Sequence, residues 1–135
     1  GSTFGSRAVI TDANGDGLRD IFLSAYLPAS AAGAVYYMPG SGFSSQNASA
    51  LANKISGITA GDAFGIALAV KDLNGDGNPD MIAGAYNRNA GAGAGQGALS
   101  IFFGPSSGFS SQNSAAANLT IAGEAAGDNF AWPVH

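Results

Sequence analysis

The stretch DLNGDGNPD, from Asp72 to Asp80, decides how the rest of the chain is interpreted. The same pattern stands sixty residues earlier as DANGDGLRD, from Asp12 to Asp20. Asn-Gly and Asp-Gly are typical of tight hairpin turns because these residues tolerate positive φ. A plain turn is therefore one interpretation, but a turn does not need three carboxylates. Two like charges about 4 Å apart repel by roughly 4 kcal/mol at an effective dielectric near 20, so a compensating cation is expected.

Calcium is the cation that these loops predict, because it takes six to eight oxygen ligands. The EF-hand loop supplies ligands from positions 1, 3 and 5 and a carbonyl from position 7, with a turn glycine at position 6. Here position 6 is Gly17 or Gly77, and the loops close with an aspartate at position 9. The lack of cysteine argues against zinc, and magnesium suits a flexible carboxylate cage less well. Two calcium sites are predicted, with ligands Asp12, Asn14, Asp16, the Leu18 carbonyl and Asp20 in one, and Asp72, Asn74, Asp76, the Asn78 carbonyl and Asp80 in the other.

Composition narrows the possible functions. Charged residues make up 10% of the 135, against roughly 25% in a typical soluble domain, and the net charge is −4. Six of the nine acids lie in the two loops, so two divalent cations would bring the chain to about zero. The five Lys and Arg residues are scattered, which argues against nucleic-acid binding. The longest uncharged stretch, 89–123, is interrupted by turn residues, so no membrane span is expected.

The loops belong to a longer internal repeat. Residues 4–26 match residues 64–86 without a gap, at an offset of 60. Further along, GAVYYMPGSGFSSQN from Gly33 matches GALSIFFGPSSGFSSQN from Gly97, and the offset grows to 66. A third copy begins near the C-terminus and stops. The repeat therefore predicts three segments, which are repeat 1 at residues 3–63, repeat 2 at 64–129 and the start of a third at 130–135.

Each repeat is expected to form four short strands, because runs of Val, Ile, Phe and Tyr are separated by Gly, Asn, Asp, Ser and Pro. A helical period is weak everywhere, and Asn47–Lys54 is its best candidate. The aspartate loop joins strands one and two as a hairpin. The prediction is an all-β fold of propeller blades, each with four antiparallel strands. The expected strands are Arg7–Thr11, Ile21–Ala25, Ala34–Met38 and Lys54–Ile58 in repeat 1, and Ile66–Lys71, Met81–Ala85, Ala98–Phe103 and Asn118–Ile121 in repeat 2.

The repeat resembles the FG-GAP repeat of integrin-alpha-type β-propellers. The resemblance covers nearly all of the chain, and the absence of cysteine and the alanine-rich symmetry look bacterial or designed rather than animal. It implies one blade per repeat, a calcium site between strands one and two, and a role in adhesion or ligand recognition outside the cell or at its surface. The residues that carry it are Phe64-Gly65, the 72–80 loop and Gly84-Ala85-Tyr86, with Phe4-Gly5, the 12–20 loop and Ser24-Ala25-Tyr26.

The third copy departs from this pattern, because Ala131 replaces the glycine of the Phe-Gly pair and the sequence stops before a third loop. Propellers usually have four to eight blades, and two blades leave open faces and edges. Three explanations stay open: part of a longer propeller, a two-blade unit that closes a ring as a homo-oligomer (a trimer or tetramer), or another fold. The first two are favoured over a closed monomer. In an oligomer the tail from Gly127 could pair with a neighbouring chain.

The predicted function is a calcium-binding propeller module for adhesion or recognition of a protein or glycan ligand, secreted and without catalysis. No Ser–His–Asp set is expected, because the one histidine, His135, ends the chain. One alternative is a carbohydrate-binding, lectin-like propeller, and another is an accessory blade pair of a secreted hydrolase or lyase. Four aromatic residues on the third strands are expected mostly in the core between blades, with the outward ones marking a binding surface: Tyr36, Tyr37, Phe102 and Phe103.

Overall fold

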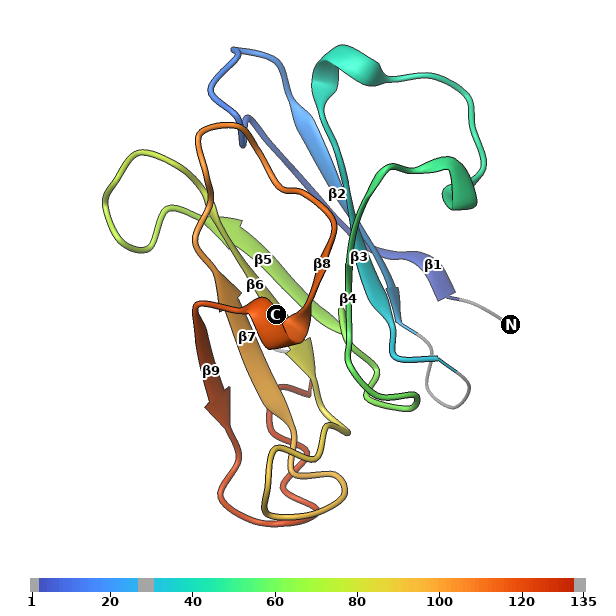
Figure 1. Ribbon diagram of the computed structural model, residues 1–135, viewed down its shortest axis with the longest axis vertical. Coiled ribbons are helices and arrows are strands. Elements are labelled where there is room, and N and C mark those ends of the chain that lie inside the picture. The colour runs from blue at the N-terminus through green and yellow to red at the C-terminus, as the bar shows by residue number, and fades with distance from the viewer. Residues whose placement is uncertain (1–2, 27–30, 133–135) are drawn as a thin grey trace.

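The computed structural model describes residues 3–26 and 31–132, so His135 and the rest of 133–135 lie outside the described residues. The chain is all-β, and its strands form two sheets that lie against each other (Figure 1). Within these described residues, three short 3-10 helices interrupt the loops: η1 (Gly40–Gly42), η2 (Ala48–Ala50) and η3 (Ser114–Ala116). The strands are β1 (Thr3–Thr11), β2 (Asp20–Tyr26), β3 (Ala34–Met38), β4 (Asn53–Ser56), β5 (Ala67–Lys71), β6 (Asp80–Ala85), β7 (Ala98–Phe102), β8 (Gln112–Asn113) and β9 (Leu119–Ala122).

The two sheets follow the two repeats. The first sheet has the order β1-β2-β3-β4-β8 and the second has the order β5-β6-β7-β9. Within each repeat, neighbouring strands are antiparallel, and each aspartate loop joins the first two strands as a hairpin. The two hairpins close on equivalent residue pairs, which are Thr11 with Asp20 and Lys71 with Asp80. An all-β fold of four-stranded units was predicted, and the strand order agrees with it.

Two details differ from the sequence prediction. Strand β8 was not predicted, and it pairs in parallel with β4 of the other repeat, so the first sheet is not purely antiparallel. A two-residue strand carries no alternation that a sequence pattern could show. The weak helical pattern at Asn47–Lys54 contains one 3-10 turn, after which β4 already begins at Asn53. The chain there is too short and too rich in Ser and Asn to continue a helix.

The hydrophobic core lies between the two sheets. One face of the first sheet contributes Phe22, Val35, Tyr37 and Ile55, which are almost fully buried. The facing side of the second sheet contributes Met81, Ala83, Ala85 and Phe102, together with Phe64 and Phe109 from loops. Because side chains alternate along a strand, each sheet turns its other face away from this core.

The repeats are joined where the Phe of each Phe-Gly or Phe-Ala pair bridges to a glycine of the preceding repeat. Phe64 forms an isolated parallel bridge with Gly33, and Phe130 forms the equivalent bridge with Gly97. A Cβ at Gly33 would lie 2.3 Å from the Phe64 carbonyl oxygen, so only glycine allows this approach. The described part of the tail therefore lies on its own second sheet, where Trp132 also meets Tyr86 edge-on at 4.4 Å.

Among the described residues, no helix has the length and apolar character needed to cross a membrane.

Candidate metal sites in the aspartate loops

Both aspartate loops fold around the side chain at position 1. The Asp12 carboxylate accepts hydrogen bonds from the backbone N–H groups of Gly15 at 2.7 Å and Gly17 at 2.9 Å. Asp72 makes the same two contacts in the second loop, again at 2.7 and 2.9 Å. The glycines have positive φ in both loops, which lets the chain curl tightly around one carboxylate. The first predicted ligand thus lies at the centre of each loop.

The side chains at positions 3 and 5 continue this pattern. Asn14 Oδ1 accepts from the N–H of Asp16 at 3.1 Å, and Asp16 Oδ1 accepts from the N–H of Leu18 at 2.8 Å. The Asn14 amide also donates to the other Asp16 oxygen at 3.0 Å. The second loop repeats every one of these bonds within 0.1 Å. Two loops of different sequence therefore reach one geometry, because Asx turns at the shared positions set the backbone.

These hydrogen bonds favour the ionised carboxylates. Partial desolvation raises the pKa of Asp12, but hydrogen bonds from backbone N–H groups, led by those of Gly17 and Gly15, together hold that pKa below its ordinary value. For Asp76 the main cause of a lowered pKa is the hydrogen bond from the Asn78 N–H, followed by that from Asn74. Both carboxylates are therefore negatively charged at neutral pH, which favours binding of a cation.

The aspartate at position 9 has a further role that the sequence did not reveal. Asp20 is fully buried and accepts from the Ala13 N–H at 2.9 Å, the Gly40 N–H at 2.7 Å and the Tyr37 hydroxyl at 3.0 Å. Burial and, to a smaller extent, the hydrogen bond to Asp20 raise the pKa of Tyr37 above its ordinary value. Asp20 therefore ties the loop to the turn that follows β3.

Asp80 makes the equivalent hydrogen bonds in repeat 2, with fewer partners. It is also fully buried, and it accepts from the Leu73 N–H at 2.8 Å and the Gly104 N–H at 2.9 Å. The residue that corresponds to Tyr37 is Ile101, which has no hydroxyl to offer. The repeated glycine after each third strand, Gly40 or Gly104, was the one sequence signal for this contact.

The kinds of oxygen donor in the two loops fit a calcium ion. The arrangement of the carboxylates fits it less well. Within residues 3–26 and 31–132, no group of three or more Asp, Glu or His side chains is gathered as a metal site. The position-9 carboxylates accept from N–H groups in part-buried or buried hydrogen bonds, whereas the side chains at positions 1, 3 and 5 accept from N–H groups within the exposed loop. An ionised carboxylate has about four lone-pair sites, so these bonds leave acceptor capacity free. The predicted ligands would hold the ion through oxygens alone, which is the set calcium prefers.

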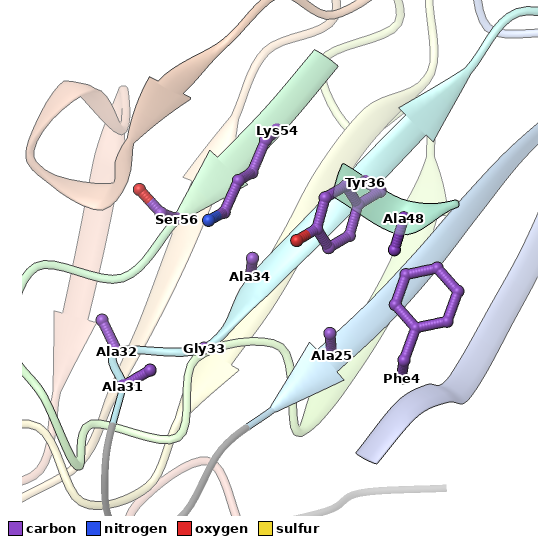
Figure 2. Close-up of a pocket in the computed structure, with 10 residues that line it drawn as sticks. All are labelled: Phe4, Ala25, Ala31, Ala32, Gly33, Ala34, Tyr36, Ala48, Lys54 and Ser56. Carbon is purple, nitrogen blue, oxygen red and sulfur yellow. The ribbon is translucent and has the colours of Figure 1, made fainter. Parts of the chain in front are cut away.

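A second candidate site is an apolar pocket on the face of the first sheet that points away from the core (Figure 2). It has a volume of about 200 Å³. The Phe4 and Tyr36 rings form one wall in an edge-on pair with centroids 5.5 Å apart, and Lys54 Nζ lies 5.9 Å from the centre of the Tyr36 ring. Of the four third-strand aromatics, Tyr37 and Phe102 are buried, Tyr36 is half-buried and Phe103 is exposed. Sequence reasoning selected Tyr36 but not Phe4 or Lys54.

Fold and loops together define an all-β repeat protein whose units each carry an aspartate-rich hairpin. A sequence model of the family described as FG-GAP-like repeat matches residues 12–83, which is more than half of the chain and runs from the first aspartate loop into β6. The chain therefore belongs to the FG-GAP-like repeat family. A comparison with curated proteins found no significant match.

Proposed function

We propose that the chain is a calcium-binding, propeller-type module for adhesion or ligand recognition, acting outside the cell or at its surface and without catalysis of its own. The observation that carries the proposal is the near-identity of the two aspartate loops, down to hydrogen-bond lengths that differ by 0.1 Å or less. A plain turn does not require three carboxylates in each loop, because Asn-Gly can close a hairpin without them. A shared ligand explains why both loops keep them.

In this proposal, calcium has a structural role. The ion neutralises the clustered carboxylates and fixes the hairpin between the first two strands of each repeat. Extracellular calcium modules bind with dissociation constants of about 10⁻⁴–10⁻³ M. At about 10 mM calcium each such site would stabilise the folded state by about 1.4–2.7 kcal/mol through mass action. The ligands are those predicted from the sequence, at positions 1, 3, 5 and 9 and the carbonyl at position 7.

The chain is further proposed to work as part of a ring. Three or four copies would give a closed homo-oligomer, or the two repeats would belong to a longer propeller. The support is that each sheet buries only one face in the described core, while propeller blades pack on both faces. Ring formation and calcium binding are separate parts of the proposal and can be tested apart.

Calorimetric titration with calcium chloride tests the metal sites. Wild type should bind two ions per chain, and Asp76→Ala should bind one, with a correspondingly smaller rise in melting temperature. Glu124→Ala is the matched control, because it removes the same charge from an exposed site outside both loops. The proposal fails if no binding is detected at 10⁻² M calcium, or if Asp76→Ala melts in calcium as wild type does.

A carbohydrate-binding module is the second candidate, and the Phe4–Tyr36 pocket is the observation that favours it. Sugar rings pack on exposed aromatic faces, and Lys54 and Ser56 provide polar groups at the pocket wall. A glycan array probed with wild type and with Tyr36→Ala tests this candidate. It predicts hits that the variant loses, and an array without hits excludes it.

A further inference from the structure

One seven-residue segment occurs twice with identical sequence and in two different environments. SGFSSQN stands at residues 41–47 in repeat 1 and at residues 107–113 in repeat 2. We call the last six residues of each the docking arm, 42–47 and 108–113. In the second arm Phe109 is 3% exposed, whereas in the first Phe43 is 49% exposed. Since the sequences are the same, the difference comes from what lies next to each arm.

The second arm binds the first sheet. Phe109 packs edge-on against Phe22 and Tyr37, with ring centroids 5.3 and 5.9 Å apart. Ser111 Oγ donates to the Ala52 carbonyl at 2.7 Å and accepts from the Lys54 N–H at 3.1 Å. The next two residues form β8 along β4 (Figure 1). The arm therefore uses one aromatic anchor and four backbone-directed contacts to extend a neighbouring sheet.

The backbone conformation of the second arm is consistent with this contact to the first sheet. Gly108 has φ +78°, and a Cβ there would lie 2.3 Å from the Tyr37 hydroxyl, so the arm runs directly over that ring. Gly42, its counterpart, ends the 3-10 helix η1 and has open space where a Cβ would be. Residues 41–47 are all exposed, and β8 has no counterpart among the described strands of repeat 1. The first arm is thus an undocked copy of the second.

The second sheet carries the surface that such an arm binds. Its face away from the core holds Ile82, Leu99, Ile101, Leu119 and Ile121, in cross-strand rows set by the pairing of β6, β7 and β9. Leu119 and Ile121 are 51% and 50% exposed. Ile121 is the counterpart of Ile55, which is fully buried and pairs with Gln112 of the second arm. The unused face therefore matches the used one position by position, with isoleucines in place of Phe22 and Tyr37.

The first sheet carries the complementary outer face. Its residues Ile21, Leu23 and Met38 correspond to Met81, Ala83 and Phe102, which are buried against the neighbouring sheet in this structure. On the first sheet the same positions are partly exposed, and Ile10 beside them is 62% exposed. One chain thus presents both halves of the interface that it forms between its own repeats.

We propose that the docking arm of repeat 1 binds the outer face of the second sheet in another copy of this chain, as the arm of repeat 2 binds the first sheet within the chain. Phe43 inserts beside Ile82 and Ile101, Ser45 takes the contacts of Ser111, and residues 46–47 pair with residues 121–122. The association is head-to-tail, which closes into a ring or continues as a filament. This inference rests on the proposed ring and names the surface that forms it.

Light scattering on the full chain over a concentration series tests the surface. Wild type should give a discrete multiple of 13.3 kDa, and Phe43→Ala should fall to the single-chain mass while melting as wild type does when dilute. Ile58→Ala is the matched control, because Ile58 is also 49% exposed but lies outside both faces and the arm. A wild type that stays monomeric at about 1 mM (Kd weaker than about 1 mM) overturns the proposal and favours a repeat of a longer chain as the occupant.

A mixing experiment tests the direction of binding. Phe43→Ala keeps an intact outer face, and Ile121→Lys keeps an intact arm, so each alone should be monomeric. Their mixture should give a one-to-one dimer at twice 13.3 kDa and nothing larger. Oligomers of unchanged mass from either variant would show that the arm and this face do not form the contact. Calcium binding is measured separately by titration, so assembly can fail without the metal sites failing.

Discussion

At the scale of single residues, the two position-9 aspartates are the most consequential side chains outside the hydrophobic core. Asp20 accepts hydrogen bonds from the loop, from β3 and from the turn after β3. Asp80 accepts hydrogen bonds from the loop and from the equivalent turn of repeat 2. Buried polar groups that lose their partner keep the full cost of desolvation, so these carboxylates stabilise the hairpin even before any ion binds.

Replacing Asp20 by alanine is expected to lower the free energy of unfolding by about 3 kcal/mol, because a buried donor without an acceptor costs about 1–3 kcal/mol and Ala13 and Tyr37 both lose theirs. Asp80→Ala should cost about 2 kcal/mol, since it has no hydroxyl partner. Urea denaturation in a chelator gives both values, and Glu124→Ala, at an exposed site outside both loops, serves as control. An Asp20→Ala protein as stable as wild type would contradict this role.

At the scale of elements, the docking arms show that identical residues form different structures. The second arm forms β8 because β4 lies beside it, and the first arm pairs with no strand among the described residues. Two residues cannot form a stable strand alone, since fixing each backbone costs about 1–2 kcal/mol. The neighbouring sheet supplies the hydrogen bonds and the apolar contacts that offset this cost.

The arms give a paired test of that view. Phe109→Ala should lower the free energy of unfolding by about 3–5 kcal/mol, the usual cost of removing a buried phenylalanine. Phe43→Ala should change it by less than about 0.5 kcal/mol in dilute solution, as surface substitutions usually do. Both are measured by urea denaturation at micromolar protein. Equal losses in the two variants would mean that the first arm is also buried within the monomer.

At the scale of the whole molecule, the two repeats share one core. Phe22, Val35 and Ile55 of the first sheet pack with Met81 and Phe102 of the second, and Phe64 lies between the repeats. Among the described residues, no separate buried cluster of this size lies on the outer face of either sheet. In repeat proteins, stability is roughly a sum of repeat terms and neighbour interfaces, and here the interface holds most of the buried apolar side chains.

Thermal unfolding should therefore be a single cooperative transition. Differential calorimetry of dilute protein in a chelator is expected to give a van't Hoff enthalpy equal to the calorimetric enthalpy. Gly33→Ala should lower the midpoint without splitting the transition, because its Cβ would push Phe64 out of the joint between the repeats. Two resolved transitions would show instead that each repeat folds alone.

Much of this architecture was predictable from local pattern. The eight expected strands occur with ends shifted by a few residues, the largest shift being at β1, which begins at Thr3 rather than Arg7. Apolar runs that are separated by turn residues predict strands from the local sequence alone. The undetected features depend on contacts between segments that are distant in the sequence: β8 against β4, Phe4 and Lys54 at one pocket, and Tyr37 on Asp20. No local pattern encodes which residue lies across a sheet.

The all-β fold, the two repeats and the register of the aspartate loops follow from local sequence pattern, because apolar runs, φ-positive glycines and Asx side chains act within a few residues. Tertiary structure alone decided that Asp20 and Asp80 are buried and that one copy of SGFSSQN is docked while the other is exposed. Burial depends on what surrounds a side chain in space. Two identical segments therefore differ here because one of them pairs with a strand of the other repeat.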